Sequence, residues 1–305
     1  MPMRKQLAKR QEEVNAALEK VFAAGKNLPQ QAIFEAMEYS LLAGGKRIRP
    51  VLLLEFAALG GLSAEDAMPF ACALEMIHTY SLIHDDLPCM DDDDFRRGRP
   101  TSHKKFGEAL ALLAGDGLLT AAFEQMLSAE SKAQPANRLA AAAEIASAAG
   151  CFGMIGGQVL DLADQKEKVR LEAEPYAAEK LTQINRLKTG ALFRAACRGG
   201  LLLAGVREER YLSAAERFAD ALGISFQIQD DILDVTGNAD ALGKQTGNDE
   251  KQGKATYVAL WGLEKAKSQV KRLTESALRE LSVFDELGGA AFLSWLVSSL
   301  SERSF

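Results

Sequence analysis

Two aspartate-rich clusters contain the side chains that could do chemistry in this chain. The first is DDLPCMDDDD (85–94) and the second, about 145 residues later, is DDILD (230–234). Both follow strongly apolar segments, where crowded carboxylates repel one another and lose hydration. A divalent cation removes both costs, and all-oxygen coordination suits Mg²⁺, which usually shares its shell with substrate phosphates. The clusters therefore predict metal ligands at Asp85, Asp91 and Asp230, whereas 92–94 is more simply a solvated helix end.

Cationic side chains accompany the carboxylates. The segment GGKRIRP (44–50) places three positive charges within four residues at a predicted helix break, and RRGR (96–99) directly follows the first cluster. Arginine binds phosphate through paired hydrogen bonds, and lysine acts as a point charge. Alone, GGKRIRP is more often a solvated turn. Together with two acidic clusters, it indicates a diphosphate site.

Helices must position these groups, because apolar residues recur at three- and four-residue spacings, as in Ala67, Ala71, Leu74 and Ile77. No convincing alternation of apolar and polar residues predicts a strand. The chain is therefore expected to be all-α, a single-domain bundle (1–305) of about ten or more helices. The predicted helices cover 3–24, 29–43, 50–60, 64–87, 106–129, 136–163, 176–203, 208–236, 255–282 and 287–301.

Composition narrows the possible partners and location. The 305 residues carry 36 Lys+Arg against 42 Asp+Glu, and this acidic balance argues against nucleic acid as a partner. No apolar run reaches the roughly 18 residues of a membrane helix, and the N-terminus has no apolar stretch typical of a secretory signal. Four scattered cysteines without CxxC spacing indicate reduced thiols. We therefore expect a cytoplasmic protein without a membrane span.

The two clusters, with GGKRIRP before them and GQVLDL and KTGALF between them, resemble in order and spacing the motifs of the trans-isoprenyl diphosphate synthases, or polyprenyl synthetases. The resemblance covers about 30–305 and is greatest to the bacterial farnesyl diphosphate synthase (geranyltranstransferase) branch. It implies helices around a deep central cavity and a homodimer. It also implies Mg-assisted ionisation of dimethylallyl or geranyl diphosphate and its head-to-tail condensation with isopentenyl diphosphate. Three Mg²⁺ ions per site are implied, with Mn²⁺ as the alternative.

The resemblance also implies a role for each matching residue. Asp85, Asp91, Asp230 and Asp234 match metal ligands, and Asp86 and Asp231 support them. The residues that match ligands of the allylic diphosphate are Arg96, Lys188 and Lys244. Those that match ligands of isopentenyl diphosphate are Lys46, Arg49, His78 and Arg97. Thr189 and Gln227 match residues near the developing carbocation. Without the resemblance, His78 and Gln227 would be interpreted as buried polar side chains, and 188–190 as a helix irregularity.

Product length is expected to depend on Tyr80, with Ser81 beside it. On the predicted helix 64–87, Tyr80 lies about 7.5 Å along the axis from Asp85. A tail anchored by its diphosphate at Asp85 and growing toward the helix N-terminus would meet this stiff ring. The resemblance associates a bulky aromatic residue here with a C15 product and smaller residues with C20.

Three alternatives remain open on sequence grounds. A geranylgeranyl diphosphate synthase of the same family is the nearest. A terpene cyclase also uses an Asp-rich helix but binds one diphosphate, so a second cationic segment like GGKRIRP is unneeded. A non-enzymatic helical protein that binds divalent ions would explain the carboxylates but not the adjacent Lys46, Arg49, Arg96 and Arg97.

Overall fold

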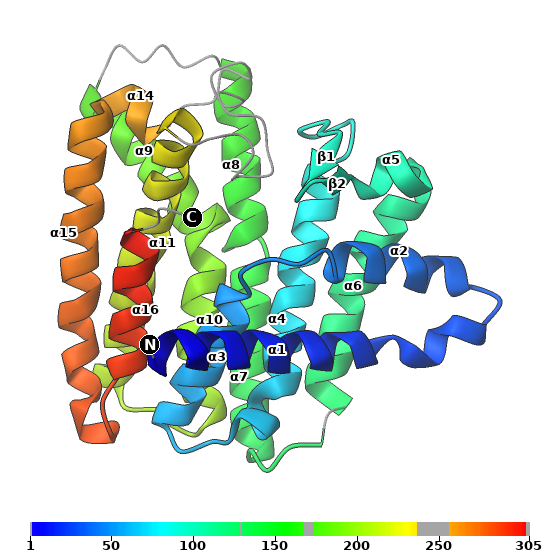
Figure 1. Cartoon of the computed structure of the whole chain (residues 1–305), viewed down its shortest axis with the longest axis horizontal. Helices are drawn as coiled ribbons and strands as arrows, with labels where there is room; N and C mark the ends of the chain where they lie inside the picture. Colours follow the sequence, from blue (N-terminus) through cyan, green and yellow to red (C-terminus); the bar gives the residue numbers. More distant parts are fainter. Residues whose placement is uncertain (1, 129, 168–173, 237–255, 303–305) are drawn as a thin grey trace.

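The computed structural model of the protein describes residues 2–128, 130–167, 174–236 and 256–302 (Figure 1). Its α-helices are α1 (Pro2–Val21), α2 (Gln31–Leu41), α3 (Ile48–Leu59), α4 (Ala64–Asp85), α5 (Ser102–Phe106), α6 (Glu108–Ser128), α7 (Pro135–Ala149), α8 (Met154–Glu167), α9 (Glu174–Lys188), α10 (Gly190–Leu203), α11 (Glu209–Thr236), α14 (Tyr257–Trp261), α15 (Leu263–Leu281) and α16 (Ala291–Ser301). Two 3₁₀ turns, η1 (Ala23–Asn27) and η2 (Ser282–Leu287), complete the described helical elements. The expected all-α architecture is confirmed.

Helix α4 is the central element of the bundle. It begins where the Ser63 hydroxyl accepts a hydrogen bond from the Asp66 amide at 3.1 Å, which satisfies one of the free amides of the first turn. From there it contacts α1, α2, α3, α6, α7 and α10, so residues around most of its circumference are buried. A helix enclosed in this way carries its polar side chains into the interior, where they need partners.

Three helices that the sequence pattern predicted as continuous are each divided into two in the structure. Residues 136–163 divide into α7 and α8, 176–203 divide into α9 and α10, and the described part of 255–282 divides into α14 and α15. At the first break, a Cβ on Gly153 would lie 2.1 Å from the carbonyl oxygen of Ala148. At the third, Gly262 has φ +73°, which favours glycine. The second break lies at Thr189, within residues 188–190, which the residues alone suggested as a helix irregularity. The first and third breaks were not predicted.

The first acidic cluster leads into a short hairpin that the sequence pattern did not predict. Strand β1 (Phe95–Arg96) pairs antiparallel with β2 (Arg99–Pro100), with Arg96 opposite Arg99. Arg97 and Gly98 form the turn with positive φ. Strands of two residues are too short to show alternation, and this explains why they were missed.

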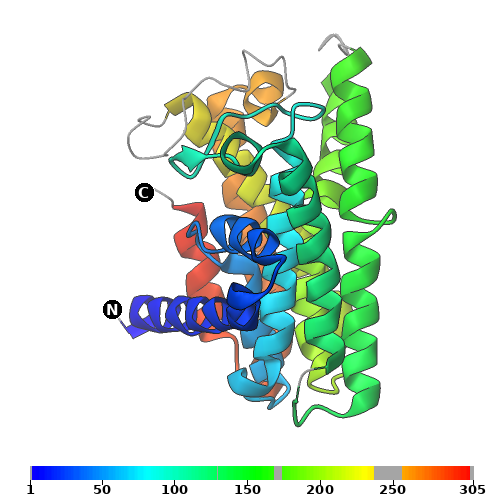
Figure 2. The ribbon, with the colours of Figure 1, turned by 90° about the vertical axis from the view of Figure 1, so that its right-hand side faces the viewer.

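Two apolar segments, α6 and 135–164, are long and apolar enough to cross a membrane. Figure 2 shows α7 and α8 following one another along one edge of the bundle. Helix α6 packs against α2 and α4, and α7 packs against α10. One or two such helices are weak evidence of a span, because core helices of a bundle have the same composition.

Candidate active site

A cavity of about 490 Å³ opens between α4, α6, α8 and α10. Among the predicted site residues, it is lined by Arg49, His78, Tyr80, Ser81, Asp85, Lys188 and Thr189. Much of the remaining wall is apolar and comes from Met90, Leu119, Met154, Ile155, Val159, Leu162 and Leu192. The cavity therefore has charged groups at one part of its wall and room for a hydrocarbon chain along the rest.

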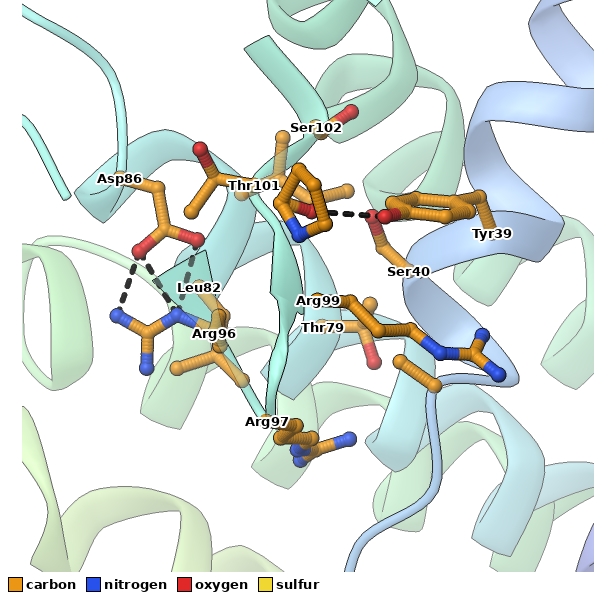
Figure 3. Close-up of a pocket in the computed structure, with 13 residues that line it drawn as sticks. Tyr39, Ser40, Thr79, Leu82, Asp86, Arg96, Arg97, Arg99, Thr101 and Ser102 are labelled. Atoms are coloured by element: carbon orange, nitrogen blue, oxygen red, sulfur yellow. Dashed lines mark hydrogen bonds and ion pairs between the residues drawn. The ribbon is translucent and has the colours of Figure 1, made fainter. Parts of the chain in front are cut away.

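The carboxylates of the first acidic cluster have two roles: some lie beside the cavity, and one pairs with an arginine. The amide of Asp91 donates to the carbonyl of Asp85 at 2.9 Å, so the chain turns back and brings these two residues together beside the cavity. Asp86 is only 3% exposed and accepts hydrogen bonds from Arg96 Nε at 2.7 and 2.9 Å (Figure 3). The carboxylate of Asp86 raises the pKa of Arg96 although burial alone would lower it. Asp86 thus fixes Arg96 beside the cluster.

Lys188 supplies a cation opposite the first cluster. Helices α8 and α9 approach closely because Gly157 has no side chain: a Cβ there would lie 2.1 Å from the Lys188 amide nitrogen. The Lys188 ammonium pairs with Asp161 at 2.6 Å. Burial alone would lower the pKa of Lys188, but the carboxylates of Asp85, Asp161 and Asp91 outweigh it and raise that pKa. Asp161, in GQVLDL, is therefore the residue that holds the predicted diphosphate ligand.

Arg49 supplies the positive charge of the cationic wall of the cavity, and His78 lies beside it. Arg49 Nη1 lies 3.5 Å from His78 Nε2, and the guanidinium lies 4.5 Å from the centre of the Phe193 ring. Burial lowers the pKa of Arg49 to about 10, so it remains charged at neutral pH. Burial and the surrounding arginines hold the pKa of His78 well below 6.5, so its imidazole is neutral. Arg49 Nε is buried and has no hydrogen-bond partner among the described residues, which leaves a donor for an anion.

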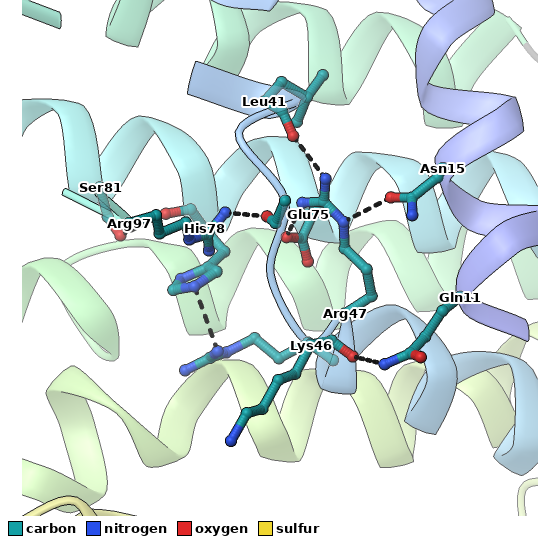
Figure 4. Close-up of polar contacts among 11 residues, drawn as sticks. Gln11, Asn15, Leu41, Lys46, Arg47, Glu75, His78, Ser81 and Arg97 are labelled. Carbon is teal, nitrogen blue, oxygen red and sulfur yellow. Dashed lines mark hydrogen bonds and ion pairs between the residues drawn. The ribbon is translucent and has the colours of Figure 1, made fainter. Parts of the chain in front are cut away.

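Arg47 differs from its neighbours in GGKRIRP. Its side chain is turned into the core and is 1% exposed, whereas Lys46 is exposed. Arg47 Nη1 pairs with Glu75 at 2.6 Å, and Nη2 and Nε donate to the Leu41 carbonyl and Asn15 Oδ1 (Figure 4). The charge of Arg47 therefore neutralises a buried carboxylate of the protein, and Lys46 and Arg49 remain the residues of this segment that match diphosphate ligands. The overlooked signal was Glu75, a carboxylate within the apolar stretch of α4 that requires a buried partner.

Arg97 lies across the same segment. Its Nη1 donates to the carbonyl of Gly44, and its guanidinium lies where a side chain on Gly45 would be, 2.9 Å from an ideal Cβ. Gly45 also has φ +121°. Two glycines here therefore let the hairpin arginine reach the loop that carries Lys46 and Arg49.

The second acidic cluster lies on α11. Asp231 is buried and accepts hydrogen bonds from Gln227 Nε2 at 3.1 Å and from the Tyr257 amide at 2.8 Å, so it joins α11 to α14. Asp230 is partly exposed, and its charge raises the pKa of Arg49, against the larger effect of burial. Asp234 is also partly exposed. Lys244 lies outside the described residues.

The carboxylates suit a divalent cation that also binds a substrate. The described residues contain no group of three His, Cys, Asp or Glu side chains arranged as a complete metal site. Asp85 and Asp91 nevertheless offer neighbouring oxygen donors beside a cavity with a cationic wall. Mg²⁺ is typically held by one or two carboxylates plus water and phosphate oxygens, and the residues present fit that pattern.

Comparisons with known proteins agree with this geometry. The sequence profile of the polyprenyl synthetase family matches residues 30–285. The chain is 45% identical to the farnesyl diphosphate synthase of Escherichia coli over 90% of its length and 89% of that protein. It is 44% identical to geranylgeranyl pyrophosphate synthase 3 of Arabidopsis thaliana, over 92% and 76% of the two chains. A crystal structure of an FPP/GFPP synthase from Zymomonas mobilis superposes with a TM-score of 0.83 at 36% identity, covering 97% and 99% of the two chains.

Proposed function

This chain belongs to the polyprenyl synthetase family and is a short-chain prenyltransferase, and we propose that its product is farnesyl diphosphate. The proposed reaction condenses isopentenyl diphosphate head to tail with dimethylallyl diphosphate and then with geranyl diphosphate. Relatives of 44–45% identity include both farnesyl and geranylgeranyl synthases, so identity does not distinguish the two products. The observation that carries the proposal is Tyr80, whose buried ring lines the cavity five residues before Asp85.

The allylic diphosphate is proposed to bind at the first acidic cluster. Asp85 and Asp91, with Asp230 and Asp234 from α11, would hold Mg²⁺, three ions being expected per site. When bound, the metal supplies positive charge for the departing diphosphate. Arg96, fixed by Asp86, and Lys188, fixed by Asp161, place permanent positive charge on the same group and so favour ionisation of the allylic C–O bond.

Isopentenyl diphosphate is proposed to bind at the cationic wall. Lys46, Arg49 and Arg97 would hold its diphosphate, and neutral His78 would accept or donate a single hydrogen bond. The apolar wall of the cavity excludes water, which would otherwise capture the allylic cation before the double bond of isopentenyl diphosphate attacks it. No side chain has to act as a nucleophile.

Tyr80 is suited to closing the far end of the cavity. Its side chain is 5% exposed, and its ring meets that of His84 edge to face at 5.7 Å. Its hydroxyl is buried without a hydrogen-bond partner among the described residues. Burial, together with the charge of Asp85, raises the pKa of Tyr80 to about 12, so the ring stays neutral. A neutral ring packed in this way is a stiff barrier to an apolar tail.

The assay that tests the proposal combines the protein with isopentenyl and dimethylallyl diphosphates and Mg²⁺, and measures product length. A predominantly C15 product supports it. A predominantly C20 product would instead identify a geranylgeranyl diphosphate synthase, and cyclic products without consumption of isopentenyl diphosphate would indicate a terpene cyclase.

Replacing Tyr80 with alanine is expected to lengthen the product. Loss of the ring opens space beyond the first acidic cluster, so Tyr80→Ala should shift products from C15 toward C20 or longer while turnover continues. Chromatography of dephosphorylated products measures the shift. Ser81→Ala, a smaller change at the neighbouring cavity position, is the control. A Tyr80→Ala variant that still stops at C15 would place the end of the cavity elsewhere.

Replacing Arg49 with alanine is expected to weaken isopentenyl diphosphate binding selectively. The variant removes a charged donor whose Nε faces no described partner, so its KM for isopentenyl diphosphate should rise about tenfold or more. The KM for the allylic substrate should change much less. Steady-state kinetics with each substrate varied separately gives both values, and an equal or larger effect on the allylic KM would show that Arg49 serves the other site.

We further propose that the chain forms one domain and works as a cytoplasmic homodimer. Apolar side chains are exposed along α6 and α8, including Leu113, Ile155 and Val159, and Phe152 between α7 and α8 is 88% exposed. Ile155 and Val159 also line the cavity, so a second copy on this face would complete its wall. All four cysteines are free, as reduced thiols would be. Sedimentation equilibrium tests the assembly, and a monomer at micromolar concentration would contradict it.

A further inference from the structure

We propose that Arg47 is a positioning residue: held by α1 and α4, it presets the segment 42–49 to receive isopentenyl diphosphate. This segment consists of the loop 42–47 and the first two residues of α3, and is called loop 42–49 below. This inference rests on the proposed function, which assigns Lys46 and Arg49 to that substrate. Arg47 lies between them in the chain, but its guanidinium is directed away from the cavity and into the core. The hydrogen bonds of its guanidinium are all made to groups of the protein itself.

The side chain of Arg47 is fully engaged. Its three guanidinium nitrogens reach three different elements: Nη1 to Glu75 on α4, Nη2 to the carbonyl of Leu41 at the end of α2, and Nε to Asn15 on α1, at 2.6, 2.7 and 2.9 Å. The Arg47 and Glu75 side chains are 1% and 3% exposed. With every nitrogen occupied and no solvent access, Arg47 cannot contact a diphosphate directly, so its effect on binding must pass through the loop.

The hydrogen bonds of the Arg47 side chain hold the backbone of the loop in an unusual conformation. Arg47 has φ +50°, a left-handed conformation that a residue with a side chain rarely adopts. Such a conformation persists when surrounding contacts determine it. Here it turns the chain so that Arg47 enters the core while Lys46 stays exposed on one side of it and Arg49 lines the cavity on the other. Figure 4 shows Lys46 and Arg47 directed to different sides of the loop.

Helix α1 provides a second restraint on the same loop. Gln11 Nε2 donates to the carbonyl of Lys46 at 2.7 Å, one helical turn from Asn15. Figure 1 shows α1 lying across the neighbouring helices, and Val14 and Leu18 anchor it in the core. This helix precedes residues 30–285, which match the family profile. A segment outside the matched region therefore holds the loop that carries two proposed substrate ligands.

A preset loop lowers the cost of binding, because the ligands need not be ordered when the substrate arrives. Loss of these restraints should therefore weaken the binding of isopentenyl diphosphate more than that of the allylic substrate. The proposed ligands of the allylic substrate lie on α4, α9 and the hairpin. The chemistry at the first acidic cluster does not involve loop 42–49, so kcat at saturation of both substrates should change little.

The first experiment separates positioning from folding with the double variant Arg47→Met/Glu75→Leu. Replacing both members of a buried ion pair with apolar residues of similar size commonly preserves stability. We expect the thermal midpoint to be retained and the KM for isopentenyl diphosphate to rise about tenfold, with the allylic KM within about twofold of wild type. A stable variant with an unchanged KM would show that the pair serves folding alone and would overturn the inference.

The second experiment leaves the buried pair intact. In Gln11→Ala/Asn15→Ala, the loss of two hydrogen bonds to the loop is expected to raise the same KM about three- to tenfold. Glu12→Ala/Glu19→Ala, on the exposed face of α1, is the matched control and should leave it unchanged. Equal effects of the two double variants, or equal changes in both substrate KM values, would overturn the inference. Failure of the wild-type protein to condense the substrates would instead refute the proposed function.

Discussion

Replacing Asp85 or Asp230 with asparagine is expected to lower kcat by about 10²-fold or more, the cost of removing one well-placed electrostatic group. Each substitution preserves the size of the side chain and removes the negative charge proposed to hold Mg²⁺. Asp85 lines the cavity at the end of α4, and Asp230 is close enough to influence Arg49. Initial rates at saturating concentrations of both diphosphates and Mg²⁺, with circular dichroism to verify folding, measure the effect.

A carboxylate of the same acidic run provides the control for this prediction. Asp94 is exposed and pairs with Lys104 at 2.7 Å on the outside of the hairpin region. Asp94→Asn should therefore retain nearly full activity. Full activity of wild type in excess EDTA would contradict the metal assignment, and a loss in Asp94→Asn as large as in Asp85→Asn would show that the net charge of the run matters more than its geometry.

Sequence spacing is most informative where candidate residues lie on one continuous helix. Tyr80, Ser81 and Asp85 all lie on α4, and a helix converts sequence spacing directly into spatial order. The start of the same helix is also defined locally, because the Ser63 hydroxyl accepts a hydrogen bond from the Asp66 amide three residues later. Positions defined by a single regular helix are therefore the ones that sequence spacing alone could place.

Roles that depend on contacts between elements were harder to predict. Asp86 and Arg96 were assigned separately, to metal support and to substrate, yet they form a close pair with each other. The sequence did not indicate a role for Asp161. Its role follows from the structure, where α8 and α9 approach closely at Gly157 and Asp161 pairs with Lys188. Sequence spacing contains no information about which side chains meet across two helices, so charge in a motif does not by itself distinguish a ligand from a partner of a ligand.

Replacing Arg47 alone with methionine is expected to lower the free energy of unfolding by about 3–5 kcal/mol, because it leaves the Glu75 carboxylate buried without its counter-ion. The substitution also leaves the Leu41 carbonyl and Asn15 without a hydrogen-bond donor that they have in wild type. Urea unfolding followed by circular dichroism measures the change. A large loss would explain why a side chain that contacts no substrate is nonetheless costly to replace.

Arg210→Met is the matched control, because the Arg210–Glu286 pair has the same 2.6 Å separation but side chains that are 59% and 64% exposed. Water solvates Glu286 when its partner is lost, so the midpoint of unfolding should barely move. A comparable loss in both variants would show that distance, and not burial, determines the contribution of these pairs. If Arg47→Met alone is strongly destabilised and Arg47→Met/Glu75→Leu is not, the cost lies in the stranded carboxylate, and the stability of loop 42–49 can then be separated from its role in binding.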